Sequence, residues 1–330
     1  MRRDILTALA VHLMVTICVL MLNVQLHALY QESSIIVVPD NYSSIQKAIN
    51  AANEGDRIFV KAGIYYMEQL VVNKTLSLLG ENPETTVIDG QGSSLVLVSI
   101  AAPETTFENF TIQNTASTRE AYGISLFRSE GARVQYNIVK DCWFGILLSE
   151  STNCEVWNNK ISHNHLCGIL LRDECSNNSI LGNSISNNPT GINVMGSSWY
   201  TDIYHNNLIN NEYQIFMGLG GHTSWDNGCE GNYWSDFEGI DLDGDGIGDT
   251  ELPWQSVDYY PLIDPFWNPG DVNHDSTVDS YDVVLVCGAY GTTTSDLNWN
   301  GHCDIAQPFG KINIYDVVLI CTNYGEEYNR

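Results

Sequence analysis

The sequence is poor in positive charge. Of its 330 residues, 14 are Lys or Arg and 40 are Asp or Glu, which gives a formal net charge of −26. From Asp236 to the end there are 18 acidic residues and two basic ones, Lys311 and Arg330. A surface this acidic repels nucleic acid and attracts cations. We therefore exclude nucleic acid as a partner and expect a bound cation.

Charged side chains are also missing from residue 5 to residue 31, directly after Met1-Arg2-Arg3-Asp4. A short basic start followed by an apolar run is typical of an export signal. Two outcomes stay open: cleavage near Ala28, with residues 1–28 as the signal peptide, or retention as an uncleaved membrane anchor. We expect cleavage, and contact with a membrane only if the segment is retained. No later segment is apolar enough to span a membrane, so we predict an extracellular or cell-surface protein.

The cysteine content fits an exported chain. Of nine cysteines, Cys18 lies in the predicted signal and eight remain in the mature chain. Disulfides persist outside the cytoplasm, but their connectivity does not follow from the sequence.

Four segments in the middle of the chain align on a glycine. They begin at Gly123, Gly145, Gly168 and Gly191, 22 or 23 residues apart, a period that indicates a solenoid. Within each segment the apolar residues alternate, which is the pattern of a strand. The residues predicted to share one face are Ile124, Leu126, Ile146, Leu148, Ile169, Leu171, Ile192 and Val194. We therefore predict an all-β fold, a right-handed parallel β-helix with coils of about 22–24 residues over residues 35–265.

A second column predicts the turns. Aliphatic residues recur every 23 to 24 residues at Ile138, Ile161, Ile185 and Leu208, and three positions after each stand Asp141, Asn164, Asn188 and Asn211. Asn tolerates the left-handed backbone of tight turns, and its amide can bond to copies in the coils above and below. The segments lack the leucine spacing of a leucine-rich repeat, which excludes that alternative.

An amphipathic segment precedes the repeats. Residues 43–52 begin with serine, a good helix N-cap, and place Ile45, Ala48, Ile49 and Ala52 on one helical face. We expect a helix that caps the first coil, because an open strand edge invites aggregation. Strand-like runs follow at residues 57–60, 70–79 and 85–88.

The run from Val38 to Gly90 resembles the opening segment of pectin-lyase-like β-helices. Together with the coils it resembles the carbohydrate-binding and sugar-hydrolase β-helix family, which includes the copper-associated periplasmic NosD proteins. Residues 231–262, which contain "GNYWSDFEGIDLDGDGIGDT" and "DYYPL", resemble the closing segment of archaeal NosD-like proteins. This resemblance implies the fold and not the chemistry.

A calcium loop is predicted at residues 241–249. The carboxylates of Asp241, Asp243, Asp245 and Asp249 alternate with glycines that let the chain curl around one ion. An all-oxygen ligand set of this density suits Ca²⁺, and without a cation the four like charges would repel one another.

The tail after Pro269 contains an internal duplication. Tyr281–Gly291, "YDVVLVCGAYG", returns at Tyr315–Gly325 as "YDVVLICTNYG". Two copies predict a small α-helical domain with paired EF-hand-like motifs over residues 269–326. The loop before the first copy has oxygen ligands at the spacing of a calcium loop: Asp271, Asn273, Asp275, the Thr277 carbonyl, Asp279 and Asp282.

This unit resembles a type I dockerin, a module that docks exported proteins onto a cohesin. The resemblance implies Ca²⁺ as the cofactor and a cohesin-like partner. Ser276 departs from the glycine expected at loop position 6. The second loop keeps Asp304, Asn313 and Asp316 at its ends, but Ala306 and Pro308 occupy ligand positions. We therefore expect the first loop to bind and the second to be weak or empty.

One column of charged residues is a candidate catalytic site. Arg128, Glu150 and Asp173 each stand five positions after a repeat glycine, so they should stack on adjacent coils. Two such carboxylates could share a proton and act on a glycosidic bond, with Arg128 positioning an anionic sugar. The alternative is a salt-bridge ladder, which we favour. The sequence lacks the Asp pair and His of a polygalacturonase and the acid and glutamine set of a pectin methylesterase.

A second candidate metal site is formed by His163, His165 and Cys167. Their alternation could place borderline or soft ligands for copper or zinc on one face, with Cys142 near. We favour the alternative of surface histidines at a turn and a disulfide-bonded cysteine.

Two function classes remain. The preferred reading is an exported calcium-binding β-helix protein that binds a polysaccharide or cell-surface glycan, or acts as a scaffold, and docks through its tail. The alternative is a polysaccharide hydrolase or lyase that uses the acidic column. Copper handling like that of NosD proteins is the least favoured reading.

Overall fold

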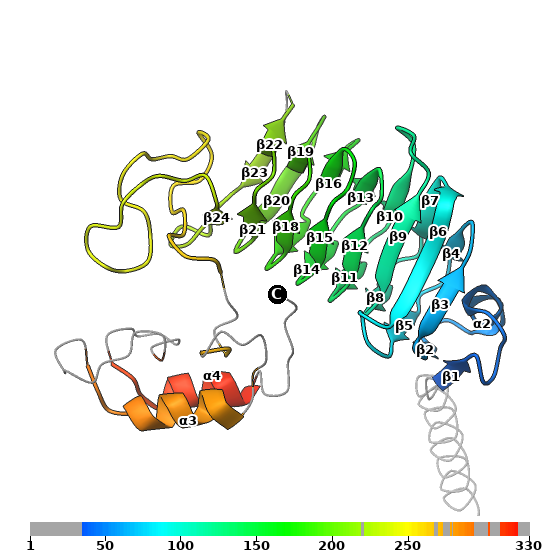
Figure 1. The fold of residues 1–330 in the computed structure, drawn as a ribbon, viewed down its shortest axis with the longest axis horizontal. Helices are drawn as coiled ribbons and strands as arrows, with labels where there is room; N and C mark the ends of the chain where they lie inside the picture. The colour runs from blue at the N-terminus through cyan, green and yellow to red at the C-terminus, as the bar shows by residue number, and fades with distance from the viewer. Residues whose placement is uncertain are drawn as a thin grey trace, which may run out of the picture. The chain divides into compact units, whose positions relative to one another are not determined.

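The computed structural model describes residues 35–218, 221–266, 270–272, 278, 280–293, 303 and 311–322. Residues 35–218 and 221–234 form stacked coils made of three parallel sheets, wound as a right-handed parallel β-helix (Figure 1). The predicted all-β solenoid is confirmed. The predicted signal, residues 1–28, lies outside the described residues.

From β2 to β24 the strands belong to the three sheets in turn, so each full coil contributes one strand to each sheet. The first sheet contains β1 (Ile35–Val38), β2 (Arg57–Val60), β5 (Ser77–Gly80), β8 (Thr106–Glu108), β11 (Arg133–Gln135), β14 (Glu155–Trp157), β17 (Ser179–Leu181), β20 (Trp199–Tyr204) and β23 (His222–Ser224). The second sheet contains β3 (Gly63–Tyr66), β6 (Thr86–Ser94), β9 (Thr111–Thr115), β12 (Ile138–Lys140), β15 (Lys160–Ser162), β18 (Ser184–Ser186), β21 (Asn207–Ile209) and β24 (Tyr233–Trp234). The third sheet contains β4 (Leu70–Val72), β7 (Val96–Ile100), β10 (Tyr122–Phe127), β13 (Phe144–Ser149), β16 (Cys167–Arg172), β19 (Thr190–Val194) and β22 (Tyr213–Met217).

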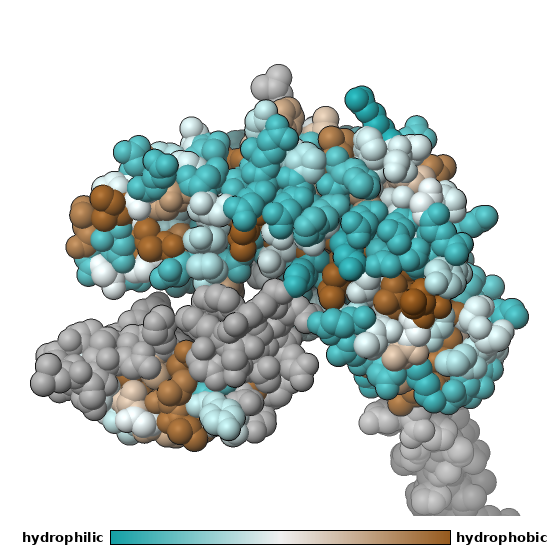
Figure 2. Space-filling view, in the orientation of Figure 1, coloured by the Kyte–Doolittle hydropathy of each residue, from teal (hydrophilic) through white to brown (hydrophobic). Residues whose placement is uncertain are grey.

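The repeat glycines are the second residues of strands in the third sheet. The aliphatic residue after each glycine pairs with its copy in the next coil, and all four copies are fully buried: Ile124, Ile146, Ile169 and Ile192. The interior of the solenoid is a column of such side chains. The visible outer face is mostly hydrophilic (Figure 2), as expected from strands that alternate inward and outward residues.

The glycine column has a steric cause. A Cβ on Gly145 would lie 2.5 Å from the backbone oxygen of Gly168, and a Cβ on Gly168 would lie 2.7 Å from that of Gly191. Neighbouring coils therefore approach too closely at this corner for any side chain.

Asparagine ladders line two corners of the solenoid. In one, the backbone N–H groups of Asn164 and Asn188 donate to the side-chain oxygens of Asn188 and Asn211, both at 3.0 Å. The predicted first member was wrong by one residue, because Val139, not Ile138, pairs with Ile161. Cys142 therefore occupies the ladder position assigned to Asp141, and its N–H donates to Asn164 Oδ1 at 3.1 Å.

A second ladder went unpredicted. Each N–H and side-chain amide in it donates to the Oδ1 of the next member, and all its members are almost fully buried: Asn137, Asn159, Asn183, Asn206 and Asn232. The last N–H, that of Asn232, donates to Asp258 Oδ2 at 2.9 Å. This ladder supplies partners for polar groups that water cannot reach.

The first coil is covered by helix α2 (Ile45–Ala51), inside the predicted range 43–52. Ser44 is its N-cap and accepts a bond from the Lys47 N–H. Gln46 bonds to both the N–H and the carbonyl of Val71 in β4, and Lys74 Nζ donates to the carbonyls of Ile49, Asn50 and Ala52. Both helix ends are thereby held on the coil.

The tail contains two helices, α3 (Ser280–Ala289) and α4 (Ile314–Thr322), one from each copy of the duplicated motif. They share a small core that includes Val286, Ile312 and Ile320, with Val283 and Val317 packed against it. None of the helices in the described ranges is long and apolar enough to cross a membrane.

In the described part of the chain the eight cysteines are free thiols, so the structure shows no disulfide among them: Cys142, Cys154, Cys167, Cys175, Cys229, Cys287, Cys303 and Cys321. Burial raises the pKa of Cys142 to about 12 and that of Cys154 to about 11. These two thiols pack in the solenoid as apolar side chains.

Candidate metal centre

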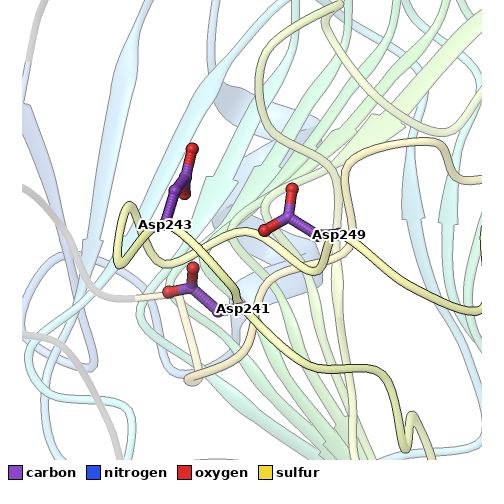
Figure 3. A group of neighbouring side chains, drawn as sticks. All are labelled: Asp241, Asp243 and Asp249. Atoms are coloured by element: carbon purple, nitrogen blue, oxygen red, sulfur yellow. The ribbon is translucent and has the colours of Figure 1, made fainter.

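The loop after β24 gathers three aspartates. Carboxylate oxygens of Asp241, Asp243 and Asp249 lie within 4.8 Å of one another (Figure 3). Oxygens bound to Ca²⁺ at 2.3–2.6 Å can be at most about 5 Å apart. The three carboxylates are therefore already spaced to share one ion.

The loop's own backbone shapes this group. Asp241 accepts bonds from the N–H groups of Gly244 (2.6 Å) and Gly246 (2.9 Å), and Asp249 accepts one from Leu242 N–H (2.7 Å). Gly244 and Gly246 have φ values of +83° and +88°, a conformation that glycine adopts readily. The alternation of Asp and Gly thus folds the chain around the carboxylates.

The electrostatics of the loop favour a cation. The N–H groups of Gly246 and Gly244 lower the pKa of Asp241, which keeps that carboxylate charged. The neighbouring charge of Asp245 is the main cause that raises the pKa of Asp243. A bound divalent cation would remove the repulsion that raises it.

Asp245, a predicted fourth ligand, is not part of the group of three. Its Oδ1 accepts a bond from the Ile247 N–H at 2.9 Å. In this geometry Asp245 shapes the turn, and its role as a calcium ligand stays a prediction.

The loop is fastened to the end of the solenoid. Gly248 N–H donates to the Pro261 carbonyl at 2.8 Å, and Ile263 N–H donates to the Gly246 carbonyl at 3.0 Å. Leu262 in turn bridges both Ile247 and Tyr233 of β24. An ion in the loop would therefore act on the segment that covers the last coil.

The tail's predicted calcium loops are only partly described. Asp271 and Asp282, the two ends of the first loop, are buried, whereas Asn273, Asp275, Thr277 and Asp279 lie outside the described residues. In the second loop Asp304 lies outside them as well. Asp316 is buried and its Oδ2 accepts the Asn313 N–H at 2.7 Å, directly before α4.

The charged column is engaged in ion pairs. Arg128 Nε lies 2.7 Å from Glu150 Oε2, with a second contact of 3.3 Å between Nη2 and Oε1. Asp173 contacts Arg172 Nε at 3.1 Å and accepts a bond from Ser149 Oγ at 3.1 Å. The three residues have positive φ, so the column stacks at a turn that follows the third-sheet strands.

The structure does not bring His163, His165 and Cys167 together. Both histidines are exposed, and the His165 ring lies 6.1 Å from that of Trp143. Cys167 is buried in an apolar cluster on the third sheet with Tyr122 and Phe144. Among the described residues, the aspartates at 241, 243 and 249 are the one group of three or more His, Cys, Asp or Glu side chains with metal-binding spacing.

Asp258 is a functional candidate that sequence reasoning missed. It is fully buried, and it accepts bonds from the N–H of Asn232, the Trp234 indole (2.7 Å) and the N–H of Tyr260 (3.0 Å). Burial raises its pKa to about 6. Asp258 continues the spacing of the Asn137 to Asn232 ladder, and it was missed because that ladder was not predicted.

Part of the chain matches a known protein family. Residues 49–239, more than half of the chain, match the family described as "Periplasmic copper-binding protein (NosD)". A segment of 91 residues, 26% of this chain, is 38% identical to the "Probable ABC transporter binding protein NosD" of Pseudomonas aeruginosa and covers 21% of that protein.

Solved β-helix enzymes are more distant. The pectin methylesterase from Yersinia enterocolitica is 20% identical over 51% of this chain and 66% of its own, with a TM-score of 0.40. The pectin methylesterase from carrot is 15% identical over 58% of this chain and 70% of its own, with a TM-score of 0.39. The catalytic domain of a GH87 alpha-1,3-glucanase is 14% identical over 64% of this chain and 49% of its own, with a TM-score of 0.43. At these values the likeness says nothing about activity.

Proposed function

The chain belongs to the NosD family, and from that premise we propose that it is an exported β-helix protein that binds Ca²⁺ and presents a glycan-binding surface. The family description names periplasmic proteins, which agrees with the export signal expected at residues 1–28. The observation that carries the calcium proposal is the group of carboxylates at Asp241, Asp243 and Asp249.

Copper, which the family description names, has no assembled site in the described part of the chain, because the donors predicted for it, His163, His165 and Cys167, do not come together. Copper prefers imidazole, thiolate and thioether donors, whereas the assembled group holds carboxylates only. Hard carboxylate oxygens suit Ca²⁺. We therefore propose calcium at residues 241–249 and derive no role for copper from His163, His165 and Cys167.

The proposed role of this ion is structural. Because the loop bonds to the segment around Leu262, and that segment bonds to β24, calcium would hold the cover of the last coil in place. A covered end protects the sheet edges from pairing with other chains.

The calcium proposal is tested by titrating Ca²⁺ into the mature protein in a calorimeter. Asp243→Asn should weaken the binding step that depends on this loop. Glu238→Gln removes a nearby exposed carboxylate outside the group and serves as the matched control. Equal calcium isotherms for the wild type and Asp243→Asn would reject the site.

A second proposal concerns the tail, which we propose docks onto a cohesin-like partner. Both helices expose the same pair of apolar side chains, Tyr281 and Val284 on α3 and Tyr315 and Val318 on α4, each at least half exposed. Exposed apolar faces of this kind often mark protein interaction sites. Binding of cohesin modules, with and without a chelator, tests this, and Val284→Asp combined with Val318→Asp should abolish it.

The polysaccharide hydrolase or lyase alternative depends on Glu150 and Asp173. Their ion pairs with Arg128 and Arg172 support a structural ladder. Assays of the mature protein against acidic and neutral polysaccharides, with and without calcium, separate the two functions.

A further inference from the structure

The outer face of the first sheet carries a hollow of about 350 Å³, lined by Glu155, Trp157, Ser179 and Leu181. These residues come from β14 and β17, where Glu155 pairs with Ser179 and Trp157 with Leu181. The residues between them, Val156 and Ile180, are fully buried inside the coil. The four lining side chains therefore point outward, and the volume is at the lower end of small-molecule sites, about 300–1,000 Å³.

One wall of the hollow is apolar and held in place. The Trp157 ring is contacted by Tyr136, with ring centroids 5.2 Å apart and planes at 66°. Leu181 continues this wall in the next coil, and Tyr204 continues it one coil further. A fixed indole beside aliphatic surface suits the flat C–H face of a sugar ring.

The other wall is polar and close to neutral. Glu155 lines this wall, and Arg133, in the preceding coil and outside the lining, lies with its Nε 3.0 Å from Glu155 Oε2. The two opposite charges compensate each other, and the pair offers both donors and acceptors. Ser179 adds a hydroxyl group in the next coil. A hydroxyl-rich neutral ligand matches this set, because each of its hydroxyl groups both donates and accepts.

The charges nearby argue against an anionic ligand. In the coil after Ser179 the paired residue is Asp202, which is exposed. The protein as a whole carries a formal charge of −26. A negatively charged uronate chain placed here would be repelled by the Asp202 carboxylate and by the net negative charge of the protein.

The two walls repeat along the solenoid. Trp157, Leu181 and Tyr204 form one outward row, and Glu155, Ser179 and Asp202 form a parallel row, with one member of each per coil. Coils are about 4.8 Å apart, a spacing set by hydrogen bonds between strands. A linear polymer laid along the axis would therefore meet an apolar wall and a polar wall at each step.

Resting on the glycan-binding part of the proposed function, we propose that this hollow binds a neutral hexose unit of a linear glycan, with Trp157 stacked on the ring and the Arg133–Glu155 pair bonded to its hydroxyl groups. Nothing in the charged column at Glu150 and Asp173 takes part. The site is a binding subsite and breaks no bond.

Calorimetry with the calcium-loaded mature protein tests the site, with neutral hexasaccharides of glucose and of mannose, oligogalacturonate and hexalysine as the probes. At least one neutral hexasaccharide should bind, with little dependence on salt, and oligogalacturonate should not. Trp157→Ala should weaken binding about tenfold or more, the usual loss when an anchoring aromatic side chain is truncated. Trp157→Phe should retain part of the affinity.

Phe127→Ala serves as the matched control, because it removes an exposed aromatic side chain on the third sheet, away from the hollow. It should bind like the wild type. A neutral glycan that binds the wild type and Trp157→Ala equally overturns this subsite and leaves glycan binding standing. If no neutral hexasaccharide binds, or if only hexalysine binds with an affinity that falls steeply with salt, the subsite and the glycan part of the proposed function are both overturned. The calcium titration of the same protein decides the calcium part independently.

Discussion

Asp258 shows at the scale of one residue how a buried charge is handled at the end of this solenoid. Asp258 occupies the position after Asn232, the last asparagine of the buried ladder. Its carboxylate accepts the hydrogen bond from the Asn232 N–H, which has no further asparagine to bond to. Burial, the main cause, and the nearby Asp226 charge raise its pKa, to about 6. Because the folded state holds this proton more tightly than the unfolded state, ionisation of Asp258 opposes folding.

The contribution of Asp258 to stability should therefore decrease as the pH rises. The contribution of Asp258 to the free energy of unfolding should be full below about pH 4 and should be lost as the pH rises through about 6, a loss on the order of 2–3 kcal/mol. Urea unfolding of the wild type and Asp258→Asn from pH 4 to pH 7.5 isolates this group. The difference between the two curves should change across that window, and a constant difference would contradict the shifted pKa.

Gly145 lies where a side chain would collide with the backbone of the next coil. In Gly145→Ala the new Cβ would meet the Gly168 oxygen at 2.5 Å and the Ile161 Cγ2 at 3.0 Å. Since the contact is with backbone of the next coil, we expect a loss of about 1–3 kcal/mol in the free energy of unfolding of the solenoid. Gly288→Ala, in α3, meets no atom within 4 Å and should leave solenoid unfolding unchanged. Equal solenoid stability in both variants would show that the corner has room.

At the scale of elements, the repeat predicted the third sheet well because its glycine and aliphatic columns are regular. The second-sheet column slipped by one residue at Ile138, since both Ile138 and Val139 are aliphatic and only Val139 is fully buried. Strand β3 was missed because its residues, Gly63–Tyr66, carry no buried alternation. Periodicity identifies strands only where one face is buried.

The sequence predicted the position of the candidate metal centre but not its internal hydrogen bonds. The alternating aspartates located the loop, but spacing alone could not show that Asp245 bonds to its own turn. The hollow at Trp157 had no signal in the sequence, because its lining residues come from two coils and only the fold brings Trp157 beside Leu181.

A substitution within the buried Asn137 to Asn232 ladder should lower the free energy of unfolding. Asn159→Ala would remove the acceptor of the Asn137 N–H and the donor to the carbonyls of Val134 and Trp157. Each buried group left without a partner costs about 1–3 kcal/mol. Thermal and urea unfolding should show a loss of at least about 3 kcal/mol, summed over these groups. Asn187→Gly, at an exposed turn with φ of +54°, should change little, and similar losses in both would contradict a special role for the ladder.

The charged column should matter little for stability. Glu150→Gln removes an ion pair whose Arg128 and Glu150 side chains are 66% and 40% exposed, so we expect a loss below about 1 kcal/mol that shrinks further in salt. Circular dichroism and urea unfolding measure it. Loss of a polysaccharide-cleaving activity in Glu150→Gln or Asp173→Asn, with an unchanged spectrum, would instead favour the enzyme alternative.

At the scale of the whole molecule, calcium should act on the tail and on the end of the solenoid but not on the coils between. Chelation should lower the helical signal of the tail, because four carboxylates predicted in the first loop would then repel one another. In the full chain Asp275→Ala should abolish this calcium response. Asp316→Ala should reduce it less, since the second loop has Ala306 and Pro308 at ligand positions and is expected to bind weakly or not at all. Identical responses in both variants and the wild type would reject the paired-loop assignment.

The central claim is that an ion at Asp241, Asp243 and Asp249 fastens the segment that closes the β-helix. The most direct measurement is amide hydrogen exchange of the mature protein with calcium and with a chelator. Calcium should slow exchange at Gly248 and Ile263, whose N–H groups join the loop to the closing segment, and at Leu262, whose N–H joins that segment to the Asn232 carbonyl. It should leave the third-sheet strands from residue 122 to residue 172 unchanged. Exchange at those three amides that is the same with and without calcium would contradict the claim.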